Sequence, residues 1–268
     1  MTASRTVIQE ANRQGNAAML GYLPLGFPTV RRSIDAAKIL VDSGFDVIEL
    51  GFPYSDPAMD GPVIQEATTL ALERGTHLDD LLEATAELND YGTSVVSMTY
   101  WNPVNWYGTA EFAKDFASAG GSGLITPDLP PEEAGEWIEA SNRYGLERIF
   151  LSAPSSPTHR LKLISEAVNG WVYAASTMGV TGARSSLDSS AEKLVERTYD
   201  AGAKVVCVGI GVSTGEQARE VAGFANGVIV GSALVRPLLD LPWREATGAL
   251  EKKALELSAG VAGQWADR

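Results

Sequence analysis

Residues 46–62 read DVIELGFPYSDPAMDGP, a short apolar run that leads into a proline-stiffened acidic loop. The run has the length of a buried strand, and a strand with two buried faces would place Glu49 on one of them. A buried carboxylate is costly unless it has a partner or a task. The loop adds two carboxylates, Asp56 and Asp60. We therefore expect an active-site wall at the end of this strand.

Apolar runs of the same kind recur along the whole chain and predict eight strands. They cover residues 18–23, 47–50, 94–99, 123–125, 148–152, 170–174, 204–208 and 227–230. Helical patterns separate them, so the strands must be parallel and buried on both faces. Eight such units predict a closed (β/α)8 barrel (a TIM barrel) rather than an open doubly wound sheet, which usually has fewer strands.

The helical patterns also predict additions to the basic barrel. Between the strands, helices are expected at residues 31–43, 63–74, 78–89, 110–119, 132–143, 157–168, 189–199 and 215–221. A polar amphipathic segment at 2–12 predicts an extra N-terminal helix, and the region from Ala233 breaks at Leu241-Pro242 before a long final helix. Because no linker or composition shift interrupts the pattern, residues 1–268 are expected to form a single barrel domain with helical insertions.

Composition limits the class of partner. The net charge of −13 over 268 residues argues against nucleic acid and against an anionic membrane surface. No apolar run approaches the ~18 residues of a membrane span, and the N-terminus lacks a signal core. The one cysteine, Cys207, excludes an intramolecular disulfide and fits a reducing compartment. We expect a soluble cytoplasmic protein that binds neither nucleic acid nor membrane.

The loops that follow the strands carry two kinds of residue. Aromatic and apolar side chains follow strands one, three and four, at residues 22–28, 100–107 and 126–131. They suit a flat, largely apolar ligand, although each could simply cover the core. Glycine-rich stretches follow strands six to eight, reading GVTG at 179–182, GIGVS at 209–213 and GSA at 231–233. These predict a phosphate site of backbone N–H groups at a helix start; tight turns are the alternative.

Basic and metal-ligating side chains are placed away from these loops. The lysines fall in expected helices, except for Lys204 at the far end of a strand, so none is expected to form a Schiff base. His77 and His159 lie at helix starts and cannot build a zinc site with one cysteine. Carboxylates, hydroxyls and Tyr173 remain. The predicted chemistry is general acid–base catalysis without a metal or organic cofactor.

Each candidate carboxylate has an alternative structural role. Glu49 could be paired with an arginine or with loop N–H groups. Asp60 could stabilise the start of the following helix. Asp56 is expected to order its loop, and Asp128 could serve the loop or a partner.

Residues 49–65, with the three glycine motifs in the same order, resemble the signature of the tryptophan synthase alpha chain family. The resemblance runs from the N-terminal helix to the last helix. It implies a (β/α)8 barrel that cleaves indole-3-glycerol phosphate to indole and glyceraldehyde 3-phosphate by a retro-aldol reaction in tryptophan biosynthesis.

The resemblance also implies roles for particular residues. Glu49 would be the general acid–base group, Asp60 would bind the indole N–H, and Tyr173 would lie beside the glycerol chain. Thr181 would meet Asp60 when its loop closes. The implied substrate-binding set is completed by Tyr22, Met98, Tyr100, Pro127, Leu151 and Ile210 around the indole, and by Gly182, Gly211, Gly231 and Ser232 at the phosphate. Tyr22 and Ile210 replace phenylalanines common in the family, and Met59 replaces an alanine.

The family's partner is a pyridoxal-phosphate beta chain in an αββα heterotetramer. The resemblance implies contacts with it through Pro53, Asp56, Pro57 and residues 102–105. Two alternatives are a stand-alone lyase that releases free indole and a weakly catalytic subunit that mainly activates a beta chain. The presence of Glu49 and Asp60 favours catalysis.

Overall fold

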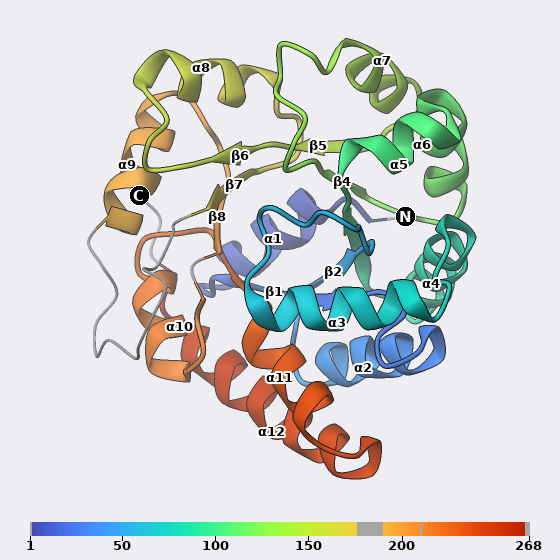
Figure 1. Ribbon diagram of the computed structural model, residues 1–268. Helices are drawn as coiled ribbons and strands as arrows, with labels where there is room; N and C mark the ends of the chain where they lie inside the picture. Colours follow the sequence, from blue (N-terminus) through green and yellow to red (C-terminus); the bar gives the residue numbers. More distant parts are fainter. Residues whose placement is uncertain (1, 176–189, 210, 266–268) are drawn as a thin grey trace.

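The computed structural model describes residues 2–175, 190–209 and 211–265. Parallel strands form one nine-stranded sheet in the order β5-β4-β3-β2-β1-β9-β8-β7-β6, with the helices around it (Figure 1). The strands are β1 Ala18–Pro24, β2 Val47–Gly51, β3 Ser94–Met98, β4 Gly123–Ile125, β5 Glu147–Ile149, β6 Leu151–Ser152, β7 Val172–Ala175, β8 Val206–Gly209 and β9 Gly227–Val230.

The ninth strand arises because the fifth predicted run is divided at Phe150. Its first half, β5, pairs with β4, and its second half, β6, pairs with β7. At the division, the Tyr173 N–H donates to the Phe150 carbonyl at 3.0 Å. The two ends of the strand order are therefore consecutive in the chain, and the sheet closes into the predicted (β/α)8 barrel.

The helices confirm the predicted alternation and add one element. They are α1 Ser4–Arg13, α2 Val30–Asp42, α3 Pro62–Glu73, α4 Leu78–Asp90, α5 Trp101–Tyr107, α6 Thr109–Ser118, α7 Gly135–Tyr144, α8 Thr158–Ala167, α9 Ser190–Asp200, α10 Gly215–Ala222, α11 Ser232–Asp240 and α12 Trp243–Val261. Within the described ranges, no helix is both long and apolar enough to cross a membrane.

The structure differs from the sequence prediction at one helix, α5, and at the start of another, α7. The segment that becomes α5 was expected to be a loop, but Pro103 lies in its first turn, where the missing N–H would have had no partner within the helix. Helix α7 begins at Gly135 rather than at 132. The N–H groups of Glu133 and Ala134 instead bond to the carbonyls of Pro130 and Pro131 in a turn.

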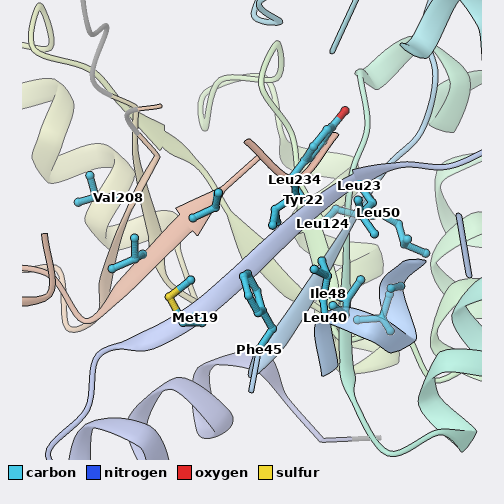
Figure 2. Close-up of a cluster of buried hydrophobic side chains, with 14 of the residues drawn as sticks. Met19, Tyr22, Leu23, Leu40, Phe45, Ile48, Leu50, Leu124, Val208 and Leu234 are labelled. Atoms are coloured by element: carbon cyan, nitrogen blue, oxygen red, sulfur yellow. The ribbon is translucent and has the colours of Figure 1, made fainter. Parts of the chain in front are cut away.

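Side-chain alternation along the strands separates two apolar layers. The layer inside the barrel contains Leu20, Val47, Val96, Ile125, Ile149, Trp171 and Ile229, with Ile8 and Ala11 of α1 beneath it. The layer between sheet and helices contains Met19 and Leu23 of β1, Ile48 and Leu50 of β2, Leu40 of α2 and Leu234 of α11 (Figure 2). Because Ile48 and Leu50 point outward, Glu49 points into the barrel, which identifies the buried face on which it lies.

Helix α1 closes the amino-terminal end of the barrel. The backbone N–H groups of Ser4 and Arg5 each donate to the Glu147 carboxylate at 3.0 Å, and the Ser4 hydroxyl also donates to it. The Trp171 indole N–H in turn donates to the Ser4 hydroxyl at 2.9 Å. Glu147, from β5, thus satisfies N–H groups that the first turn of any helix leaves unpaired. The carboxyl ends of the strands remain for chemistry.

Candidate functional site

Glu49 is a buried carboxylate without a hydrogen-bond partner among the described residues. It lies in register with Tyr22 on β1 and Val96 on β3, and its side chain is 1% exposed. Neither carboxylate oxygen accepts a hydrogen bond from any described residue. Burial raises the pKa of Glu49 to about 8, and the negative charge of Asp60 adds to the shift. In the described part of the chain, Glu49 therefore has no arginine or loop N–H partner.

Asp60 lies at the end of the loop between β2 and α3. Its backbone N–H donates to the Pro57 carbonyl at 3.1 Å, and its backbone carbonyl accepts the Gln65 side-chain amide at 2.9 Å. No side chain caps α3, whose preceding residue is Gly61. Burial raises the pKa of Asp60 to about 6. The side chain therefore does not cap the following helix.

Tyr22 and Tyr173 each lie against a glycine of the neighbouring strand. A Cβ on Gly51 would lie 2.2 Å from the Tyr22 hydroxyl, and one on Gly209 would lie 2.3 Å from the Tyr173 hydroxyl. Each glycine follows by two residues the register partner of its tyrosine. Burial raises the pKa of both phenols well above the usual value, with smaller contributions from the carboxylates of Glu49 and Asp60. Both rings therefore need a glycine beside them to reach this position.

A cavity of about 190 Å³ brings the two carboxylates together at the carboxyl ends of the strands. Of the predicted site residues, it is lined by Glu49, Asp60, Tyr173, Tyr22, Met98, Gly211, Gly231 and Ser232. Pro127 and Leu151 line a neighbouring cavity of about 200 Å³ instead, and Tyr100 lines neither. Thr181, Gly182 and Ile210 lie outside the described residues.

The lining also includes residues whose part in the site the sequence pattern does not indicate. They are Met59, Gly61, Ile64 and Ile229; Gly209, which also lines the cavity, belongs to a glycine stretch expected at the phosphate site. Ile229 could have been found from strand alternation, because the inward side of β9 is shared with Gly227 and Gly231. Ile64 could not, because its position depends on how α3 packs over the barrel.

The far wall of the cavity is built from backbone rather than from basic side chains. Gly209 and Gly211 follow β8, and Gly231 precedes α11, whose first residue is Ser232. Gly211 has a φ of 74°, a conformation that favours glycine. The start of a helix offers unpaired N–H groups and the positive end of the helix dipole. No lysine or arginine occurs among the described lining residues, so the described groups that could hold an anion here are backbone N–H groups and the Ser232 hydroxyl.

A larger cavity, of about 650 Å³, lies at the opposite end of the barrel between α1, α9 and the segments that precede β8 and β9. Its central polar groups bond to one another. The Asn226 amide donates to the Asn12 side chain at 2.9 Å, and the Tyr199 hydroxyl donates to the Asn226 side-chain carbonyl at 2.5 Å. This network links α1 and α9 to the segment that precedes β9, which indicates a structural role for these three side chains.

Comparison with known proteins gives one consistent result. A family model described as Tryptophan synthase alpha chain matches residues 8–261. The tryptophan synthase alpha chain of Bifidobacterium longum is 55% identical over 254 residues, 92% of this chain and 87% of that protein. The Thermobifida fusca protein of the same name is 51% identical over 266 residues, 97% of this chain and 98% of its own length. A solved structure of Mycobacterium tuberculosis tryptophan synthase superposes with a TM-score of 0.90 at 49% identity, covering 97% of this chain and 99% of that one.

Proposed function

The chain belongs to the tryptophan synthase alpha chain family, and we propose that Glu49 and Asp60 carry the reaction of that family in the cavity they share. The reaction is the cleavage of indole-3-glycerol phosphate to indole and glyceraldehyde 3-phosphate, a lyase step of tryptophan biosynthesis. The alpha chain pairs with a beta chain. We further propose that residues 1–268 act as one catalytic domain in the cytoplasm, in keeping with one continuous sheet and a biosynthetic role.

The observation that carries the proposal is the state of Glu49. With a pKa of about 8 and no described hydrogen-bond partner, its carboxyl group is protonated at neutral pH and has its oxygens free for a substrate. A general acid works best when its pKa lies near the operating pH. The environment of Glu49 thus suits a group that first gives a proton and later takes one.

In the proposed reaction, Glu49 gives up one proton and later takes up another. The protonated carboxyl group gives its proton to indole C3, and positive charge develops on the ring nitrogen. The carboxylate then removes the proton of the glycerol hydroxyl next to the ring. The bond between C3 and the glycerol chain breaks, its electron pair restores the aromatic ring, and the aldehyde of glyceraldehyde 3-phosphate forms. Glu49 ends as it began.

The other cavity residues would support these steps. An ionised Asp60 would accept the indole N–H and stabilise the charge that develops on the nitrogen. Tyr173 would lie beside the glycerol chain, and Gly211, Gly231 and Ser232 would offer backbone N–H groups to the phosphate. Tyr22 and Met98 would contact the ring. Such a cradle would bind an anion despite the net charge of −13.

The proposal is tested by Glu49→Gln, which keeps the side-chain volume and removes the exchangeable proton. We expect indole release to fall at least ~10³-fold, near the limit of detection, because both proton transfers use this group. Substrate binding and the circular dichroism spectrum should be retained. Glu83→Gln, at an exposed position on α4, is the matched control and should be fully active. Normal turnover by the Glu49 variant would refute the assignment.

A further inference from the structure

Tyr100 makes a direct connection between the end of β3 and the loop that carries Asp60. The backbone N–H of Met59 donates to the Tyr100 hydroxyl at 2.9 Å. The Tyr54 ring, from the same loop, stacks on the Tyr100 ring with centroids 4.8 Å apart and an angle of 18° between the planes. One tyrosine therefore holds the loop at both a ring and a backbone group, and the held backbone group directly precedes Asp60.

At the start of the loop, the Phe52 N–H donates to the Met98 carbonyl of β3 at 2.9 Å; the remaining hydrogen bonds of the loop are local. Within the described residues, Ala58 bonds to the Asp56 carbonyl, Asp60 bonds to the Pro57 carbonyl, and the Ser55 hydroxyl bonds to Asp56. The Gln65 amide, on α3, reaches the Asp60 carbonyl. None of these bonds fixes residues 53–60 relative to β3. Among described partners, the Tyr100 hydroxyl supplies the one hydrogen bond from residues 53–60 to the neighbouring βα unit.

Tyr100 is itself held rigidly. Its side chain is 6% exposed, and it immediately precedes α5. The first N–H of that helix, from Trp101, donates to both oxygens of the Asp128 carboxylate, at 2.9 and 3.1 Å. Asp128 follows β4, so the loops after β2, β3 and β4 are joined at this point. A side chain fixed in this way can define the position of the loop that carries Asp60.

We propose that Tyr100 is a positioning residue, whose hydroxyl fixes the Met59 backbone so that the Asp60 carboxylate is directed into the cavity. The described hydrogen bond of the Tyr100 hydroxyl is the one it accepts from the Met59 N–H, so the hydroxyl acts directly on the loop. This inference rests on the role proposed above for Asp60. Misplacing a charge-stabilising group by a fraction of an ångström weakens it in the transition state more than in substrate binding.

The test is Tyr100→Phe, which removes the hydroxyl and keeps the stacked ring. Tyr54→Phe is the matched control, because it removes from the same ring pair a hydroxyl that bonds to no described residue. Indole release is measured with the beta chain in excess for both variants, alone and combined with Asp60→Asn. We expect Tyr100→Phe to lower kcat about 10-fold, equivalent to about 1.4 kcal/mol in the barrier. KM should change less than about twofold, as for a transition-state effect, and the control should match the wild type.

The combined variants separate the possible explanations. If Tyr100 acts through Asp60, its hydroxyl should have no further effect once Asp60→Asn is present. An equal loss in both backgrounds would overturn the proposal, because the hydroxyl would then act independently of Asp60. Wild-type activity of Tyr100→Phe beside an impaired Asp60→Asn would overturn it while leaving the proposed function intact. Full activity of Asp60→Asn would remove both the role of Asp60 and the positioning role that depends on it.

Discussion

At the scale of single residues, the site contains two carboxyl groups that share a cavity and hold their protons differently. The pKa of Glu49 is about 8 and that of Asp60 about 6, and burial is the first cause of both shifts. Between these values Glu49 is protonated and Asp60 is ionised. Because the two pKa values differ in this way, Glu49 can act as an acid while Asp60 stabilises positive charge, and neither role needs a basic residue.

This difference predicts a bell-shaped pH dependence of kcat/KM. Activity should rise as the pH increases through about 6, because Asp60 must be ionised, and fall through about 8, because Glu49 must be protonated. The two limbs report apparent values of the coupled pair. Initial rates between pH 5 and pH 9, taken at subsaturating substrate on the order of one tenth of KM, measure the profile. Constant kcat/KM across this range would contradict the assignment of both groups.

Asp60→Asn should lower kcat by ~10²-fold or more, because it replaces a charge that opposes the developing positive ring with a neutral amide. The variant should also lose the acidic limb of the pH profile while keeping the basic limb of Glu49. Near-normal turnover would leave Asp60 with a role in loop structure alone.

At the scale of elements, α1 depends on a carboxylate from a distant strand. Glu147→Gln keeps the shape of the side chain but removes the charge that accepts the N–H groups of Ser4 and Arg5. Hydrogen bonds to a charged acceptor contribute about 1.5–3 kcal/mol, but burial raises the pKa of Glu147, so the cost of burying its charge offsets part of this gain. We expect a net loss of about 1 kcal/mol in the free energy of unfolding. Urea denaturation measures it. Activity at low temperature should be unchanged, since Glu147 is at the other end of the barrel. An unchanged denaturation midpoint would contradict the stabilising role of Glu147 at the start of α1.

The elements show which features a sequence can reveal. The strands were predictable because each is a short apolar run, and alternation along β2 placed Glu49 on a buried face without showing that this face is the inner one. Helix α5 was missed because aromatics and Pro103 resemble a loop when the helix start they occupy is unknown. The bond between Tyr100 and Met59 could not be predicted, since it depends on two loops that meet only after the barrel closes. The unpartnered state of Glu49 likewise depends on all its neighbours.

At the scale of the whole molecule, the mouth of the barrel exposes apolar side chains beside the site. Trp106 on α5 is 89% exposed and Met59 is 52% exposed. They belong to the segments that follow β3 and β2, where the beta chain is expected to contact this subunit. Large apolar side chains left in water at such a place favour a role in association.

Trp106→Ala should therefore weaken activation by the beta chain without affecting the basal reaction. We expect the beta-chain concentration for half-maximal indole formation to rise about 10-fold, as for the loss of an interface aromatic worth ~1.4 kcal/mol. A titration with beta chain measures it, and indole release by the isolated subunit should stay within about twofold. If beta chain has no effect on the wild type, the subunit is a stand-alone lyase; unaltered activation of the variant would place the contact elsewhere.

The division of the fifth strand at Phe150 has a consequence for how the protein behaves in crowded solution. Because β5 bonds to β4 and β6 bonds to β7, every strand of the described sheet has a hydrogen-bonded neighbour on both sides or continues into a segment that has one. An open sheet presents edge strands that can recruit strands from other molecules, and this sheet presents none. Ordered aggregation would therefore first require the barrel to open, so the free energy of opening limits the fraction of molecules that can associate in this way.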